Sequence, residues 1–586
     1  MHQPAGLFRS VVRNKEKDGA GLTGDAPYGM SDEHFFQKSA TAAFNIKKNE
    51  LITTLGLSPQ VHLRQKHNLI ILDEKNCTTQ VFLEKYYKEL ILREDMRKKE
   101  IIVLFVITLS ILSFFTTYSL HFDYKFPYHH DEWQHLAISL QAIESGYNRQ
   151  FNPYLGVGKP HADLEPGFHL FLSELFSLTG FIPVTSYKYL AAFFAVITSI
   201  TIFFVIYRLT GDIKIAAISS VLFTFLPTNV NILGKNYFVP MTMSFPLIFI
   251  YVLFFTEAMR HSDIKKFYFS ILILATLFFI YPLSFIVLLL PTLFEVFRNW
   301  KTISNIGMKN KFAVRIFLIP SLVFAFLMIW KGKLKHTIPY LKGLIFFEPG
   351  WGRLEISYFI PLLYGLSNTF LAVYGFIQVY LNNKYKNLYF FSIVSIISLF
   401  ITALFNMLGF TFLIPYSRAI HYAMLFMIPL TAIGLVHLVI KVKEKIGIYG
   451  VVFVIIIFIA FNIYPIYPLN EKYQRYLPAP PIAQSDYNAL LFVKDSFGKG
   501  NIIITPYFMT SAVYPASGNK VISLIPAQME GGNVEDNLNF YSYDCMKKEE
   551  IIKKSGAKFV LSRLDISCIF LKEIYNREST LVYMYD

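Results

Sequence analysis

The sequence predicts an α-helical polytopic membrane protein with a small α/β domain at its C-terminal end. Three observations support this class. Of the 586 residues, 54% are hydrophobic and only 16% are charged, whereas soluble domains carry about 25% charged residues. Apolar runs long enough to cross a bilayer recur through most of the chain. Beyond residue 468 these runs stop, and short strand-like and helix-like segments alternate instead.

Residues 1–100 are polar and are predicted to form a cytoplasmic N-terminal extension without recognisable chemistry. The extension ends in the basic cluster 93–99, directly before the first apolar run, Ile101 to Leu120. Such a cluster favours the cytoplasmic side of a membrane. The following loop, 121–186, should then face outward, and its excess of acidic residues agrees with this orientation. We therefore expect a multi-pass protein of the plasma membrane, with its N-terminus in the cytoplasm and its C-terminal domain outside.

The transmembrane domain is predicted to cover residues 101–467 with about eleven spans. The expected spans are 101–120, 187–207, 213–233, 239–259, two short helices within 267–297, then 316–330, 358–381, 388–408, 419–440 and 448–466. The pair within 267–297 is divided at Tyr281-Pro282, because a proline inside a helix removes a hydrogen bond and clashes with the preceding turn. The net charge of +15 comes from Lys and Arg clusters between these runs, so we expect no nucleic-acid partner.

Residues 468–586 are predicted to form an extracytoplasmic α/β domain. A stiff linker at 478–481 precedes its expected helices and strands. Strands are expected at 501–505, 520–524, 558–562 and 581–585, and helices at 484–497 and 546–555. The domain has no Gly-x-Gly-x-x-Gly motif, so nothing supports a nucleotide site there. Cys545 and Cys568 both fall in this domain, but their separation alone does not decide whether they pair.

Polar chemistry is concentrated in the segment 127–137, which holds two adjacent carboxylates and three histidines: Asp131, Glu132, His129, His130 and His135. Apolar residues recur there at helical spacing, which predicts an amphipathic helix along the membrane surface with Asp131 at or near its N-cap. Free N–H groups and the helix dipole favour ionised carboxylates at that position. His135 follows Asp131 by four residues and therefore lies on the same side of the helix.

Three roles are open for this acidic pair. Ionised Asp131 can act as a general base toward an acceptor hydroxyl. With Glu132, His129 or His130 it can instead hold a divalent cation such as Mg or Mn. It can also do no more than cap the helix.

A second polar group in the same loop begins another amphipathic segment and adds candidate substrate-binding residues, namely Asp163, Glu165 and His169. Pro166 suits the first turn of a helix that starts there.

Basic side chains on the outer side complete the set of candidate site residues. Arg418 lies at the outer end of the span 419–440, where an arginine can bind a phosphate through two parallel hydrogen bonds or extend to lipid headgroups. His421 is one turn deeper and can assist the phosphate or pack in the interior. Lys235, in the short outer turn between two spans, is a further candidate for phosphate binding.

The segment from His130 to Ala137 resembles the first-loop acidic motif of the GT-C superfamily of integral-membrane glycosyltransferases, which includes protein mannosyltransferases and oligosaccharyltransferases. The segment from Ser417 to Tyr422 is similar to the arginine segment that meets the lipid-linked phosphate in the oligosaccharyltransferase branch. In architecture the resemblance covers residues 101–586. It implies a polyprenyl- or dolichyl-phosphate-linked sugar donor, catalysis by Asp131 and Glu132, and stabilisation of the phosphate leaving group by Arg418.

Two departures from that family narrow the expectation. The C-terminal domain lacks a WWD-type acceptor motif, and the turn from Gly234 to Pro240 lacks the second acidic pair that oligosaccharyltransferases use for metal. We therefore expect transfer from a simpler lipid-linked sugar to an acceptor glycan, lipid or protein. Two other functions stay open: a transporter or flippase of a lipid-linked glycan, which would place charges within its spans, and a non-catalytic membrane scaffold.

Overall fold

The computed structural model describes residues 65–66, 69–70, 99–146, 152–155, 163–229, 232–299, 360–408, 414–463, 481–524 and 533–586. The chain divides into two compact units, Met1–Lys98 and Lys99–Asp586. In the first unit, β1 (Gln65–Lys66) pairs antiparallel with β2 (Leu69–Ile70). The second unit contains a helical bundle and a C-terminal sheet. The span predicted at 316–330 and the loop after it lie outside the described residues.

Helices make up the bundle of the second unit. They are Lys99–His121, α6 (Lys188–Thr210), α7 (Ile213–Thr224), α8 (Pro240–His261), α9 (Ile264–Ile280), α10 (Pro282–Arg298), α14 (Ile360–Tyr364), α15 (Leu366–Leu381), α16 (Tyr389–Leu408), α17 (Tyr416–Ile446) and α18 (Ile448–Ile463). Within the described ranges, five helices are long and apolar enough to cross a membrane: Lys99–His121, α6, α8, Asn383–Phe405 and α17. The count of eleven spans stays a prediction.

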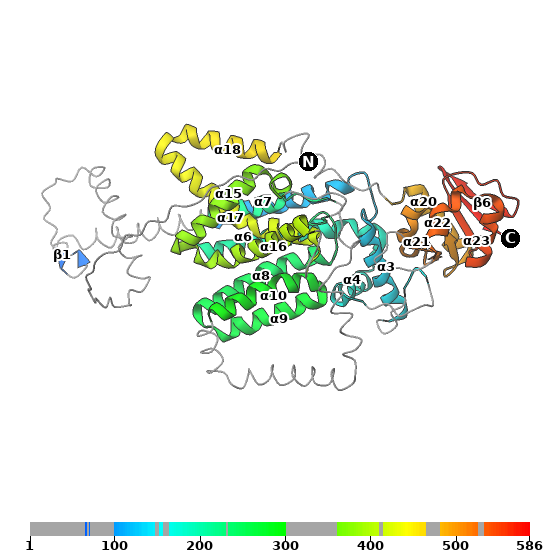
Figure 1. The fold of residues 1–586 in the computed structure, drawn as a ribbon, viewed down its shortest axis with the longest axis horizontal. Coiled ribbons are helices and arrows are strands. Elements are labelled where there is room, and N and C mark those ends of the chain that lie inside the picture. Colours follow the sequence, from blue (N-terminus) through cyan, green and yellow to red (C-terminus); the bar gives the residue numbers. More distant parts are fainter. Residues whose placement is uncertain are drawn as a thin grey trace, which may run out of the picture. The chain divides into compact units, whose positions relative to one another are not determined.

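Prolines mark two helix boundaries in this bundle. The sequence predicted one of them and did not predict the other. The break at Tyr281 is confirmed, because α9 ends at Ile280 and Pro282 is the first residue of α10. These two helices pack against each other and run beside α8 (Figure 1). The span predicted at 213–233 is wrong in its second half. Helix α7 ends at Thr224, and Pro227 three residues later cannot continue a helix.

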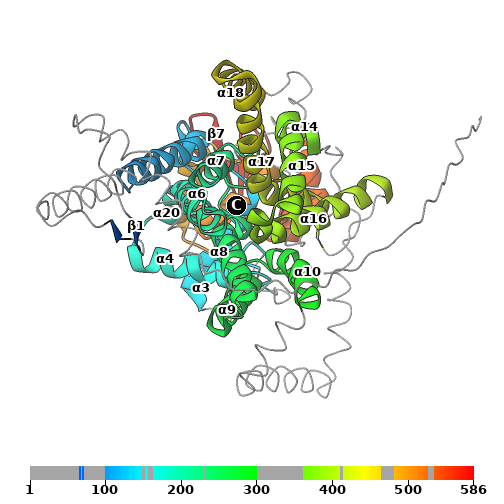
Figure 2. The same cartoon turned by 90° about the vertical axis from the view of Figure 1, so that its left-hand side faces the viewer.

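Helix α17 lies in the middle of the bundle and packs against α7, α15 and α16 (Figure 2). At its crossing with α15 both helices carry a glycine. A Cβ atom on Gly375 would lie 1.8 Å from the carbonyl oxygen of Leu430, and one on Gly434 would lie 2.0 Å from that of Leu371. Only glycine therefore permits this approach of the two backbones, as at many crossings of membrane helices.

Charged pairs collect at one end of the bundle. Arg208 of α6 and Lys266 of α9 both pair with Glu257 of α8, Lys384 pairs with Asp212 at the start of α7, and Arg298 pairs with Glu295 within the last turn of α10. The opposite end therefore holds the N-termini of α8 and α17 and the break at Tyr281.

The polar segment of the first loop forms α3 (His130–Ser145) and the second polar group begins α4 (Pro166–Thr179). Pro166 occupies the first turn of α4, as predicted. The expectation of a surface helix with one exposed polar face is wrong for the first half of α3, because every residue from Glu132 to Ser139 is buried. The two helices pack together, and the Ser173 hydroxyl donates to the carbonyl oxygen of Ser139 at 3.0 Å.

The C-terminal segment is an α/β domain, as predicted, with a five-stranded sheet in the order β4-β3-β5-β7-β6. Its elements are α20 (Gln484–Phe497), β3 (Ile502–Ile504), α21 (Thr510–Ser517), β4 (Lys520–Val521), α22 (Val534–Asn539), α23 (Cys545–Ser555), β5 (Phe559–Ser562), β6 (Leu571–Arg577) and β7 (Thr580–Tyr585). Strand β3 pairs parallel with β4 and β5, and β7 pairs antiparallel with β5 and β6. Cys545 and Cys568 form a disulfide.

Helix α21 of this domain packs directly on α3. The Nδ1 atom of His130 lies 3.0 Å from the Ser511 hydroxyl, and the Tyr154 hydroxyl donates to the carbonyl oxygen of Ser511 at 2.7 Å. Lys499 forms an ion pair with Glu144 near the other end of α3. The first turn of α3 is thus held from the side of the α/β domain as well as from the bundle.

Candidate functional site

Asp131 is the second residue of α3 rather than its N-cap. His129 is the cap, and its Nδ1 atom accepts the Asp131 N–H at 3.1 Å. Burial would raise the pKa of the Asp131 carboxyl. The neighbouring His129 ring and the guanidinium of Arg418 outweigh burial and hold this pKa below its usual range. Asp131 is therefore an ionised carboxylate near neutral pH, as a general base must be.

Glu132, next to it, has its carboxylate occupied by backbone groups. Oε2 accepts the N–H groups of Tyr128 and His129 at 2.8 and 2.9 Å, and Oε1 accepts that of Phe238 at 2.7 Å. Burial raises its pKa to about 7, although the three donors act in the opposite direction. The contacts give Glu132 a positioning role, because it fixes the start of α3 to the turn before α8. Catalysis by Glu132 stays a prediction.

Arg418, in the first turn of α17, reaches the same place from the other half of the bundle. Its Nη1 atom donates to the carbonyl oxygen of Ile232 at 2.9 Å. The guanidinium lies within electrostatic reach of Asp131 and Glu165, and within hydrogen-bonding reach of the Tyr281 hydroxyl. Acidic and basic groups far apart in the sequence thus meet at one end of the bundle.

Tyr281 is a site residue that the sequence analysis did not identify. The break between two apolar helices was visible in the sequence, but its proximity to the polar loop was not. Helix α4 closes on this break, since a Cβ on Gly167 would lie 3.1 Å from the backbone of Phe279. The close approach brings Glu165, the N-cap of α4, beside Tyr281.

Lys235 and His421 lie around the same turn that Arg418 contacts. Lys235 is only 4% exposed, and burial lowers its pKa to about 8. Its ammonium group donates to the Asn236 side chain at 3.1 Å. His421 is fully buried and stacks on Phe245, with 5.2 Å between ring centroids. In the part of the chain that the structure describes, neither ring nitrogen of His421 has a hydrogen-bond partner.

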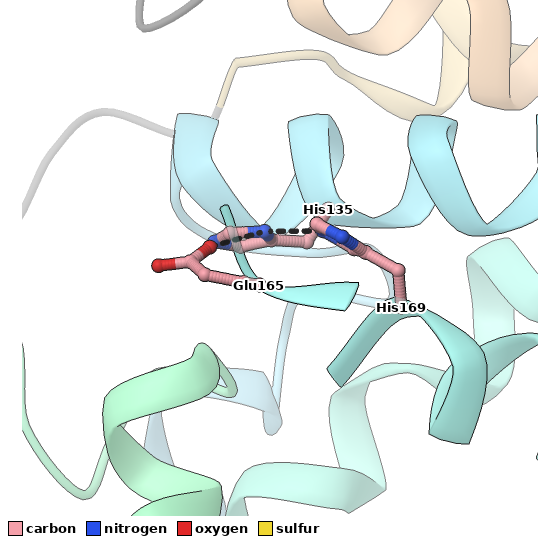
Figure 3. A group of neighbouring side chains, drawn as sticks. All are labelled: His135, Glu165 and His169. Carbon is pink, nitrogen blue, oxygen red and sulfur yellow. Dashed lines mark hydrogen bonds and ion pairs between the residues drawn. The ribbon is translucent and has the colours of Figure 1, made fainter. Parts of the chain in front are cut away.

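The remaining candidates, Asp163, Glu165, His135 and His169, lie where α3 and α4 pack together, and Figure 3 shows how His135, Glu165 and His169 face one another. His169 Nδ1 lies 2.8 and 2.9 Å from the two carboxylate oxygens of Asp163, and His169 Nε2 lies 2.9 Å from Nδ1 of His135. Glu165 Oε2 is 3.7 Å from the same His135 atom. Burial, followed by the neighbouring His169, lowers the pKa of His135 to about 3, and burial, followed by the charge of Asp163, raises that of Glu165 to about 8.

The predicted metal ligands do not converge. The His130 ring faces Ser511, and the oxygens of Glu132 accept backbone N–H groups, so these two residues do not join Asp131 around a common point. Among the described residues, the group with convergent ligand atoms is instead His135, Glu165 and His169, whose donor atoms all lie within 4.8 Å of one another. Two imidazoles and a carboxylate are a chemically suitable set for a divalent ion.

The fold defines a multi-pass membrane protein, with Asp131, Arg418 and Lys235 at one end of its bundle. No family model and no curated protein matches the chain. In structure it is similar to the Archaeoglobus fulgidus oligosaccharyltransferase in its apo form, with 14% identity over 78% of this chain and 69% of that chain and a TM-score of 0.49. It is also similar to ArnT from Cupriavidus metallidurans bound to undecaprenyl phosphate, with 10% identity over 82% of this chain and 97% of that chain and a TM-score of 0.49.

A third similar structure is the archaeal oligosaccharyltransferase AglB from Archaeoglobus fulgidus in complex with an inhibitory peptide and a dolichol-phosphate. Its identity is 13% over 79% of this chain and 69% of that chain, with a TM-score of 0.48. Because all these TM-scores lie below 0.5, we base the proposed function on the geometry of the site.

Proposed function

We propose that the chain is an integral-membrane glycosyltransferase, which moves a sugar from a polyprenyl- or dolichyl-phosphate-linked donor to an acceptor on the extracytoplasmic face. The observation that carries this proposal is that Asp131 and Arg418, from distant parts of the chain, lie within electrostatic reach of each other at one end of the bundle. Lys235 adds a buried cation in the turn whose Ile232 carbonyl accepts a hydrogen bond from Arg418.

Each group then has one chemical task. The acceptor oxygen attacks the anomeric carbon of the donor sugar while the bond from that carbon to the phosphate oxygen breaks. Asp131 takes the proton that the acceptor hydroxyl loses. Arg418 and Lys235 stabilise the negative charge that stays on the departing lipid phosphate, where oriented cations in a buried site are most effective. His421 lies beside this phosphate position through its contact with the turn.

Glu132 and Tyr281 fix the positions of these groups relative to one another. Glu132 binds the N–H of Phe238 and so joins the helix of Asp131 to the segment that follows Lys235. Tyr281 lies between Arg418 and Glu165. A divalent ion held by His135, Glu165 and His169 would add positive charge beside Asp131 and polarise an oxygen bound to it.

Two features favour an extracytoplasmic position for the site. The basic ends of the helices lie at the far end of the bundle, as expected for the cytoplasmic side. The Cys545–Cys568 disulfide belongs to the domain that packs on α3, and disulfides persist in oxidising compartments. Both features agree with an N-terminus in the cytoplasm.

The acceptor can be a glycan, a lipid or a protein.

Transfer from a radiolabelled prenyl-phosphate sugar by membranes that contain the chain tests the proposal. Asp131→Asn keeps the size of the side chain and removes the base, so the rate should fall by roughly 10²- to 10⁴-fold. Asp123→Asn is the matched control, because Asp123 is exposed in the same loop and should transfer like wild type. Unchanged transfer by Asp131→Asn would remove Asp131 from the chemistry. Movement of intact donor across the bilayer without transfer would favour a flippase.

A further inference from the structure

We propose that His135, His169 and Glu165 form a binding site for a nitrogen-preferring divalent transition-metal ion, with zinc as the representative ion, and that Asp163 positions His169 for it. This site uses neither Glu132 nor His130, which the sequence predicted as metal ligands together with Asp131. It does not require the chain to be a transferase, because it depends only on these four side chains.

The three ligands come from two helices that are already fixed to each other. His135 projects from the second turn of α3, while Glu165 and His169 come from the N-cap and first turn of α4 (Figure 3). Both histidines are buried, at 5% and 1% exposure. Because α3 and α4 pack directly, the ligands are held in place before any ion arrives, which lowers the conformational cost of binding.

The hydrogen bonds determine which nitrogens can ligate. A carboxylate can only accept, so His169 donates through Nδ1 to Asp163, and its Nε2 atom carries the lone pair. That lone pair points at Nδ1 of His135, 2.9 Å away. A carboxylate behind a ligand histidine is the usual arrangement that fixes the ring and raises its basicity in metal sites.

Without an ion, His135 donates its Nδ1 proton to His169. For both atoms to bind a metal, that proton moves to Nε2 of the same ring, which remains neutral. The bond between the rings is then replaced by two nitrogen–metal bonds. Ligand atoms about 2.1 Å from a tetrahedral zinc ion lie roughly 3.4 Å apart. In the structure, His135 Nδ1 lies 2.9 Å from His169 Nε2 and 3.7 Å from Glu165 Oε2. These distances bracket that value, so small side-chain rotations suffice.

The chemistry of the donors selects the class of ion. Two imidazole nitrogens and one carboxylate oxygen suit zinc or cobalt, whereas magnesium and manganese prefer oxygen ligands. Three protein ligands leave a fourth position open, which is typical of sites that also bind water or substrate. Asp131 lies within electrostatic reach of both His135 and Glu165, so an ion here would sit beside the proposed base.

The test is metal binding by the full-length chain, purified in detergent without a polyhistidine tag and stripped with a chelator. After equilibration with zinc or cobalt, elemental analysis should find about one ion per chain, and bound cobalt should give the visible absorption of a tetrahedral site. A large excess of magnesium should not displace it. His169→Gln should lose the ion, and Asp163→Asn should weaken binding by about 10- to 100-fold while the stoichiometry at saturation is unchanged.

His130→Gln is the matched control, since His130 lies on the same helix but faces Ser511. It should bind zinc like wild type. A stripped wild-type chain that takes up no zinc or cobalt would overturn the proposal, as would loss of the ion in His130→Gln but not in His169→Gln. The Asp163→Asn chain retains all three proposed ligands. A monodisperse, folded sample of this variant that binds zinc with wild-type affinity would therefore refute the role of Asp163. None of these measurements uses sugar transfer, so their failure is distinct from failure of the proposed activity.

Discussion

The buried Lys235, in the turn that Arg418 contacts, predicts a defined pH dependence. Burial lowers the pKa of Lys235 to about 8. The protonated fraction should therefore fall from about nine-tenths at pH 7 to about one-tenth at pH 9. If the ammonium group binds the donor phosphate, kcat/KM for the donor should fall about tenfold over this range, because kcat/KM reports groups of the free enzyme. A lipid-linked phosphodiester keeps a single negative charge throughout, so the donor itself does not titrate.

The Lys235→Arg variant separates this effect from other groups that titrate nearby. Glu132 and Glu165 change charge in a similar range, with pKa values of about 7 and 8, and they are present in both proteins. Arginine stays protonated, so the alkaline fall should disappear or shrink markedly in Lys235→Arg. Lys125→Arg, at an exposed position in the first outer loop, should behave like wild type. A wild-type profile that is flat between pH 7 and 9, or one that falls equally in Lys235→Arg, would refute the assigned role of Lys235.

Three further predictions follow from local geometry. Gly375→Val places a side chain against the carbonyl oxygen of Leu430 and should sharply lower the thermal stability of the purified chain; unaltered melting would contradict the close helix crossing. Cys545→Ser opens a disulfide with a sequence separation of 23, which should cost about 3 kcal/mol of domain stability in denaturant-dependent proteolysis, and equal protease resistance would argue against the bond. Gly234→Ala adds a Cβ 2.8 Å from His421 at a φ of +125°, so transfer should fall; full activity would mean that this turn does not shape the site.

Much of the fold could be read from the sequence because its signals are local. Apolar runs, basic clusters and the Tyr281-Pro282 break each act over a few residues, and the structure has helix boundaries at that break. Strand β6 was missed because it is an edge strand with four exposed residues and a charged, irregular pattern instead of clean alternation. The end of α7 was missed because hydropathy continues through Pro227, where backbone geometry stops the helix.

The site was predictable only in its composition. Residue types and their side of the membrane follow from motif and loop position, so the candidates could be named. Their partners are set by helix packing, which sequence spacing does not record. Glu132 illustrates this limit: its carboxylate looked catalytic in the sequence, but in the structure it accepts the N–H of Phe238, a residue of a separate loop. The pairing of His135 with His169 equally depends on the contact between α3 and α4.

The turn at 232–239 explains how groups from three parts of the chain reach one place. Its first carbonyl accepts Arg418, its glycine lies against His421, and the N–H of Phe238 binds Glu132. Lys235 lies between these contacts in the sequence and is buried. The turn therefore connects α3, which carries the proposed base, to α17, which carries the proposed phosphate ligand. Because the base and the phosphate ligands are fixed through the same short segment, a displacement of this turn should disturb proton transfer and leaving-group stabilisation together rather than either one alone.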